Sequence, residues 1–196
     1  MHYIMKTRKI DLVFESHSYF GYYVIPWLKS YYPTVPFVDY VHAENWSWRN
    51  GEYPRDSTAI AGLLDKTYTC TKYLKSQMTE KMGRTTDNVM PVYIGVDENE
   101  FDEEKVKIED DEDLARVYEK YKNKKIILYC CRISREKRPL LAIKILKKVC
   151  DEEKDAVMFV VGDGDKLNNM KKMAEKLELN ENVVFFGSKN NVKPFY

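Results

Sequence analysis

The sequence predicts an α/β protein with two parallel sheets, each incomplete within this chain. Short apolar segments alternate with helical patterns along most of the 196 residues. This alternation is typical of strand–helix–strand units in parallel sheets. An acid-rich stretch interrupts it near the middle of the chain. Because the chain begins and ends within the pattern, we expect a fragment of a longer two-domain protein.

The first half, residues 1–97, contains four strand signals separated by helical stretches. Apolar runs bounded by turn residues predict the strands, and Thr71 is expected to cap the third helix. The predicted strands are residues 10–14, 37–41, 66–70 and 88–94. Three helices are predicted. The first ends at Tyr31, the second spans residues 57–65, and the third runs from Thr71 to about Met82.

Residues 98–122 differ from both halves in composition. Residues 98–113 are rich in acidic side chains and poor in apolar ones, and residues 114–121 have a charged helical pattern. Such a charge run is typical of a solvated segment. We therefore expect an acidic linker and a connecting helix between two domains.

The second half, residues 123–196, restarts the alternation. Residues 125–131 form a continuous apolar run, typical of a parallel strand covered on both faces. Pro139 suits the first turn of a helix that reaches Val149. Its predicted buried face carries Leu140, Ile143, Leu146 and Ile145. Further strands are predicted at residues 156–161 and 182–186, with a helix at residues 167–177.

Composition excludes several classes of protein. Lys+Arg (32) nearly balance Asp+Glu (31), so nothing indicates a basic nucleic-acid binder. The four cysteines lack C-x-x-C spacing and nearby histidines, which makes a zinc site improbable. The first residues lack the apolar core of a signal peptide, and no apolar run is long enough to span a bilayer. We expect a cytoplasmic protein with reduced thiols, for which peripheral membrane attachment stays open.

The loop from Arg132 to Arg138 is the strongest site signal. It follows a predicted strand and opens a helix, and ligands of parallel sheets bind at such carboxyl edges. A helix N-terminus favours anions, and Arg132 and Lys137 add fixed positive charge. This combination suits a diphosphate, and a solvated basic loop is the alternative.

Four segments resemble motifs of glycosyltransferase family 4, a group of retaining nucleotide-sugar glycosyltransferases with the GT-B fold. ILYCCRISREKRPLLAIKIL resembles the loop G-R-x-x-x-E-K-G, and VYIGVDENEF resembles P-N-G-V-D-x-x-x-F. FVVGDGDKL resembles the G-D-G-P turn, and NVVFFG resembles N-V-x-F-x-G. The resemblance covers about residues 10–196. It implies that residues 1–97 belong to the N-terminal, acceptor-side Rossmann-like domain and residues 123–196 to the C-terminal, donor-binding one.

The resemblance also implies roles for individual residues. Arg132 and Lys137 would bind the donor diphosphate and stabilise it on departure. His42 would contact the donor sugar across the interdomain cleft, with a surface or capping histidine as the alternative. Cys131 and Arg138 replace two glycines of the family loop, and we expect Arg138 to face solvent. The turn residues expected near the nucleotide are Gly162, Gly164 and Gly187.

Other residues are candidates for the sugar-binding cleft. Aromatic side chains interleaved with polar ones between residues 45 and 55 suit sugar recognition, and a packed surface loop is the alternative. The candidates are His17, Trp46, Trp48 and Arg49, and for His17 a structural role is favoured. Asp163 and Asp165 form a D-x-D pattern. We expect no metal there, because Arg132 and Lys137 supply the positive charge.

The resemblance implies transfer of a sugar from a nucleoside-diphosphate sugar to a carbohydrate or lipid-linked acceptor, with retention of the anomeric configuration. Polysaccharide or glycoconjugate synthesis at the inner membrane face is the expected context. No cofactor is expected, since the nucleotide sugar is a substrate. The E-x7-E pair of relatives is expected beyond Tyr196, so the isolated chain is expected to be inactive. A non-catalytic nucleotide- or phosphate-binding module is the alternative.

Overall fold

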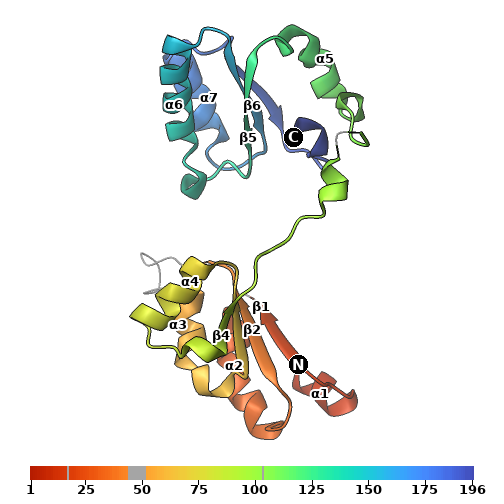
Figure 1. The fold of residues 1–196 in the computed structure, drawn as a ribbon, viewed down its shortest axis with the longest axis vertical. Helices are drawn as coiled ribbons and strands as arrows, with labels where there is room; N and C mark the ends of the chain where they lie inside the picture. The colour runs from red at the N-terminus through yellow and green to blue at the C-terminus, as the bar shows by residue number, and fades with distance from the viewer. Residues whose placement is uncertain (17, 44–51, 103) are drawn as a thin grey trace. The chain divides into compact units, whose positions relative to one another are not determined.

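A computed structural model describes residues 1–16, 18–43, 52–102 and 104–196. The chain divides between Val96 and Asp97 into two compact units, here called unit 1 and unit 2 (Figure 1). Each unit contains one sheet whose strands are all parallel. This confirms the predicted α/β class with two parallel sheets. Among the described residues, no helix has the length and apolar character needed to cross a bilayer.

Unit 1 is built on a four-stranded sheet in the order β1-β2-β3-β4. Its strands are β1 (Val13–Ser16), β2 (Phe37–Val41), β3 (Lys66–Thr69) and β4 (Val89–Pro91). Its α-helices are α1 (His2–Thr7), α2 (Tyr19–Tyr31), α3 (Glu52–Ala59) and α4 (Lys72–Ser76), and α4 continues as a π-helical turn over Gln77–Lys81.

One face of this sheet packs against the helices, and its apolar core includes Ile25, Leu28 and Phe37. The other face leaves Phe14 and Met90 exposed. Figure 1 shows α2, α3 and α4 gathered on one side of the sheet.

The elements of unit 1 differ from the prediction at several places, including α1, which was not predicted. β1 is shifted by a few residues and runs from Val13 to Ser16, and β4 is only Val89–Pro91. The helix predicted at residues 57–65 instead ends at Ala59, before a 3-10 turn at Ala61–Leu63 that contains Gly62. The cap at Thr71 is confirmed, because its hydroxyl accepts a hydrogen bond from the Leu74 amide at 3.0 Å.

Unit 2 is built on a three-stranded sheet in the order β5-β6-β7. Two helices cover one face of this sheet, and a third covers the other (Figure 1). The strands are β5 (Lys125–Cys130), β6 (Ala156–Val161) and β7 (Val183–Gly187). The helices are α5 (Glu112–Tyr121), α6 (Pro139–Glu152) and α7 (Leu167–Lys176).

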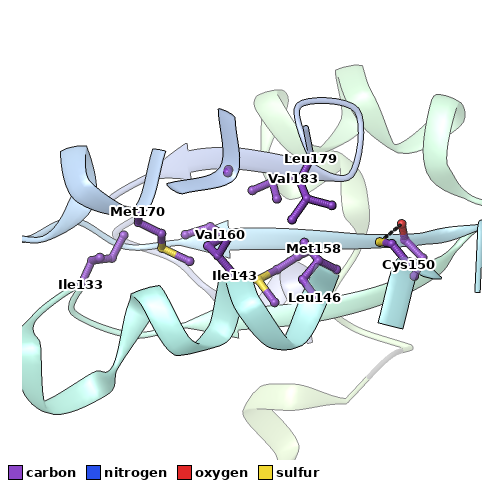
Figure 2. Close-up of a cluster of buried hydrophobic side chains, with 11 residues drawn as sticks. Ile133, Ile143, Leu146, Cys150, Met158, Val160, Met170, Leu179 and Val183 are labelled. Carbon is purple, nitrogen blue, oxygen red and sulfur yellow. Dashed lines mark hydrogen bonds between the residues drawn. The ribbon is translucent and has the colours of Figure 1, made fainter. Parts of the chain in front are cut away.

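The larger core of unit 2 lies between the sheet and the pair α6 and α7 (Figure 2). Ile143 and Leu146 of α6 meet Met158 and Val160 of β6 there, and Met170 of α7 closes the cluster. These side chains are 4% exposed or less. Burial of such side chains is the main favourable term in folding, so this layer fixes the position of the loops at the ends of the strands.

Two predictions about burial in unit 2 are wrong. β5 was expected to be covered on both faces, yet it is an edge strand whose residues are half-buried or exposed, and only its neighbour β6 is buried throughout. Ile145 was expected on the buried face of α6 but is 52% exposed, whereas Cys150 is buried. Helical periodicity explains the difference within α6, because Cys150 follows Ile143 and Leu146 on one face.

Residues 98–122, expected to join the domains, lie within unit 2. Leu114 and Tyr121 of α5 are buried against Val157 and Phe159 of β6. The acidic composition of this segment conceals an apolar stripe at helical spacing. The sheet face that α6 and α7 leave open is therefore covered by the helix that precedes β5.

Candidate functional site

The predicted anion loop begins directly after β5 and ends where α6 starts. Ile133 and Ser134 are buried, while Arg132 and Lys137 are exposed. A 3-10 turn spans Arg135–Lys137, and Arg138 follows in the left-handed conformation with φ +53°. Glycine adopts this conformation more readily than arginine. Arg138 stands where the similar motif has a glycine, and its conformation is one that favours glycine.

Backbone hydrogen bonds join this loop to the turn after β6. The Cys131 amide donates to the Val161 carbonyl at 3.1 Å, and the Ile133 amide donates to the Asp163 carbonyl at 2.8 Å. The Lys166 amide donates to the Ile133 carbonyl at 3.0 Å. The two loops therefore form one rigid edge at the carboxyl ends of β5 and β6.

Gly162 and Gly164 make this close contact possible. A Cβ atom at Gly162 would collide with the Cys131 carbonyl oxygen, and one at Gly164 would collide with the Ile133 carbonyl oxygen. Their φ angles of +135° and +157° also lie where other residues are strained. The sequence predicted a tight turn here, and the structure adds that the glycines allow the two loops to touch.

A pocket of about 280 Å³ lies at this edge. Its lining residues are Cys130, Cys131, Arg132, Val161, Gly162, Asp163, Ser188, Lys189 and Val192. The Gly162 amide donates to the Gly187 carbonyl at 2.7 Å, so Gly187 adjoins the same turn. Arg132 and Gly162 thus line the pocket, and Gly187 contacts Gly162 beside it. Lys137 and Gly164 are in the same pair of loops but do not line it.

Charges around the pocket leave the Arg132 guanidinium available for an anion. Its contact with Glu136 is long, at 3.8 Å, and both side chains are well exposed. A hydrogen bond from Ser134 lowers the pKa of Glu136, and the nearby Arg132 and Lys137 lower it further. Arg132 can grip phosphate oxygens in a bidentate manner.

Lys189, which also lines the pocket, is held differently. It forms ion pairs of 2.9 Å with Asp111 and 2.7 Å with Asp113, and its side chain is 14% exposed. The charge of Lys189 is therefore neutralised within unit 2. Asp111 also caps α5 by accepting from the Leu114 amide, so Lys189 ties the loop after β7 to the start of α5.

His42 follows β2 at the carboxyl edge of the sheet in unit 1. Its Nε2 lies 2.9 Å from the hydroxyl oxygen of Ser16, the last residue of β1. The thiol of Cys70 donates to the His42 carbonyl at 2.8 Å, and the Tyr40 ring meets the imidazole edge-on at 4.3 Å. The ring of His42 is thus held by Ser16 and Tyr40, and its backbone carbonyl by Cys70. The other sugar-cleft candidates, His17, Trp46, Trp48 and Arg49, lie outside the described residues.

A row of buried polar side chains crosses the sheet of unit 1 below this edge. Glu15, Asp39 and Thr67 are register partners on β1, β2 and β3 and are all buried. The Tyr22 hydroxyl donates to Asp39 at 3.0 Å. The Arg84 guanidinium donates to the hydroxyls of Thr67 and Ser57 at 2.8 and 3.1 Å.

The sequence prediction did not identify this row. Its one visible signal is Asp39 in the middle of the apolar strand FVDYV. Burial raises the pKa of Asp39, against the opposing effect of hydrogen bonds from Thr67, Ser57 and Tyr22. One Oδ atom of Asp39 has no hydrogen-bond partner among the described residues. The charge of Arg84 also opposes the rise in the pKa of Asp39.

The described residues contain no group of three or more His, Cys, Asp or Glu side chains placed to hold a metal ion. In the D-x-D pattern, Asp163 accepts from the Gly164 amide at 2.6 Å, and Asp165 pairs with Lys166 at 2.9 Å. Both carboxylates therefore have partners from their own turn.

One family model matches part of the chain, within unit 2. Residues 110–196 match the family model described as "Glycosyl transferases group 1". No curated protein matches the chain.

Solved structures resemble the chain over nearly its whole length. Alr3699/HepE from Anabaena, in complex with UDP, is 14% identical with a TM-score of 0.72, covering 99% of this chain and 52% of that one. A glycosyltransferase from Rickettsia africae ESF-5 is 20% identical with a TM-score of 0.71, covering 100% and 51%. A structure of TarM is 15% identical with a TM-score of 0.70, covering 98% of this chain and 36% of that one.

The chain thus spans about half the length of the first two proteins and about a third of the length of TarM. At such low identity, the likeness concerns the fold. The chain therefore has the fold of GT-B glycosyltransferase structures, with two parallel sheets, and its residues 110–196 match glycosyl transferases group 1.

Proposed function

We propose that this chain is part of a glycosyltransferase that transfers a sugar from a nucleoside-diphosphate sugar to a carbohydrate or lipid-linked acceptor. Retention of the anomeric configuration, as in glycosyltransferase family 4, is part of the proposal. The match of residues 110–196 supports the reaction class. The UDP bound in the Anabaena structure supports a nucleoside-diphosphate donor.

One observation indicates which residues would bind the diphosphate. The loop after β5 is joined to the glycine turn after β6, and Arg132 lines the pocket beside Gly162. An arginine at the edge of a parallel sheet suits the negative charge that develops on a departing diphosphate. We assign this role to Arg132 and Lys137, without a metal ion.

His42 is proposed to hydrogen-bond a hydroxyl of the donor sugar and so orient the anomeric carbon. Its ring is held by Ser16 and Tyr40, which suits a positioning role because a fixed donor loses less entropy on binding. Polysaccharide or glycoconjugate synthesis in the cytoplasm, at the inner face of the membrane, is the proposed setting. Sugar recognition by His17, Trp46, Trp48 and Arg49 also remains a proposal.

Calorimetric titration with UDP tests the site. We expect Arg132→Ala and Lys137→Ala each to weaken UDP binding about tenfold, because each removes one charge-assisted hydrogen bond to a phosphate. Arg135→Ala is the matched control, since it removes an equally charged, exposed side chain from the same loop. Wild-type affinity in both Arg132→Ala and Lys137→Ala would show the site assignment to be wrong.

Turnover of UDP-sugars by a version of the chain extended at both ends, followed by NMR of the anomeric proton, tests the reaction. Release of UDP with formation of a glycoside of unchanged configuration is the expected result, and His42→Ala should slow it without changing UDP affinity. UDP binding without any turnover, in this chain and in a version extended at both ends, would favour a non-catalytic nucleotide-binding module instead.

A further inference from the structure

The two cations of the proposed diphosphate site lie at opposite ends of one loop, and each end has its own anchor. The Arg132 end is anchored by Ile133, which is fully buried and exchanges backbone hydrogen bonds with Asp163 and Lys166. Figure 2 shows Ile133 at the end of the buried cluster near Met170. The position of Arg132 is therefore set by the core of unit 2.

The Lys137 end is anchored by a side chain of β5. The Tyr129 hydroxyl donates to the Lys137 carbonyl at 3.0 Å. Lys137 closes a tight turn in which its own amide donates to the Ser134 carbonyl at 3.1 Å. The Tyr129 hydroxyl thus reaches across the loop to its far end.

Tyr129 is suited to hold a backbone in place. Its ring packs against the core formed by α6, α7 and the sheet, and a tyrosine has few rotatable bonds. Burial raises the pKa of its hydroxyl, and the neighbouring Cys131 thiol raises it further. The hydroxyl therefore remains protonated, and able to donate, at neutral pH.

We propose that Tyr129 is a positioning residue, whose hydroxyl sets the spacing between Lys137 and Arg132 and thereby the affinity of the loop for a diphosphate. This inference rests on the proposed function. A lysine side chain is flexible, so its reach is governed by where its backbone is fixed. Without the Tyr129 hydrogen bond, the turn at Lys137 can move relative to Ile133, and binding must then supply the cost of ordering it.

Tyr129→Phe tests the proposal, because it removes the hydroxyl and keeps the ring. We expect two effects: faster amide exchange at Lys137 and Arg138 in the ligand-free chain, and UDP binding weakened about threefold to tenfold. Tyr32→Phe is the control, since it removes a tyrosine hydroxyl that contacts His2 in unit 1. It should leave UDP binding and the exchange of the loop unchanged.

A double-mutant cycle separates positioning from a general loss of stability. Tyr129→Phe should weaken UDP binding in the wild-type chain but have little effect when Lys137→Ala is already present. An equal loss in both backgrounds, or wild-type affinity in Tyr129→Phe, would overturn the proposal.

The exchange measurement also keeps the two hypotheses apart. If the wild-type chain binds neither UDP nor inorganic pyrophosphate, the proposed function fails. Unchanged exchange at Lys137 in Tyr129→Phe would then overturn the positioning role as well, whereas faster exchange would support it.

Discussion

Gly164 lies directly against the carbonyl oxygen of Ile133, with no room for a side chain between them. The contact joins the turn after β6 to the loop that carries Arg132. Because the Lys166 amide donates to the same carbonyl at 3.0 Å, the two loops keep one fixed separation. The geometry of the proposed anion site therefore depends on a residue that carries no functional group.

Gly164→Ala should destabilise unit 2 by about 2 kcal/mol or more, because the φ of +157° is strained for alanine and the new Cβ would strike a backbone atom. Urea unfolding followed by circular dichroism measures this change. All three tryptophans lie in residues 1–96, so tryptophan fluorescence reports unit 1 and should be unaffected.

Gly62→Ala is the control for this prediction. A Cβ at Gly62 would meet no atom within 4 Å, so this change should be neutral or slightly stabilising. Equal losses of stability in the two variants would contradict the steric explanation.

Asp39 and Asp65 should give unit 1 opposite dependences on pH. Burial raises the pKa of Asp39, so its contribution to stability is greatest below the unfolded value of about 3.9 and is lost as pH rises through the raised pKa. The Phe37 amide, assisted by Lys29, lowers the pKa of Asp65. Its contribution is present above the unfolded value and is lost as pH falls through the lowered pKa.

Urea unfolding of unit 1, followed by tryptophan fluorescence between about pH 3 and pH 7, measures both dependences. In the wild type, Asp39 should make the free energy of unfolding fall as pH rises, and this fall should be absent in Asp39→Asn. Asp65 should make the free energy of unfolding rise with pH over the lower part of the same range, and this rise should be absent in Asp65→Asn. The prediction fails if both variants change the slope in the same direction.

Arg84→Leu should lower the free energy of unfolding of unit 1 by about 3 kcal/mol near neutral pH, because it leaves the buried Asp39 carboxylate without its compensating charge. The loss should shrink on acidification, since Asp39 can then take up a proton. Arg8→Leu, which removes an exposed arginine from the same unit, is the control and should have little effect. A loss in Arg84→Leu that does not vary with pH would argue against coupling to Asp39.

Lys189→Met should destabilise unit 2 on the order of 1 kcal/mol, because it breaks the half-buried pairs with Asp111 and Asp113. The exchange of amides in the loop after β7 should rise with it. Lys193→Met removes the more exposed pair with Glu100 at 3.3 Å and should change stability less. If the two lysine variants lose equal stability, burial is not what strengthens the Lys189 pairs.

The elements of this fold were predictable because their signals are local. β2 was predicted with its observed bounds, and the cap at Thr71 and the first-turn Pro139 are both confirmed. Strand and helix periodicities, caps and turn residues act over a few residues of chain, so they can be read without knowing what packs against what.

The placement of the candidate loop was predictable for a similar reason. A polar loop between a strand and a helix must lie at the carboxyl edge of a parallel sheet. Arg132 was expected at this edge on this ground, and the family resemblance placed Gly162 near the nucleotide. Both residues line the pocket at this edge. Their roles in binding stay predictions.

Other features depend on which distant segments meet, and only the tertiary structure decided these. The half-burial of β5 follows from its place at the edge of the sheet, which its apolar sequence does not reveal. The row of Glu15, Asp39 and Thr67 exists because three separate strands align in one register. Strand register is specified by packing between segments far apart in the chain.

The sequence by itself therefore determined most of the strands and helices, the class of fold and the loop in which to look for an anion. The tertiary structure decided why Gly162 and Gly164 must be glycines, which charges are neutralised, and how Tyr129 reaches the backbone of Lys137. The physical reason is the separation along the chain over which each effect acts. Local preferences act between near neighbours in the chain, whereas close contact and burial are properties of the packed whole.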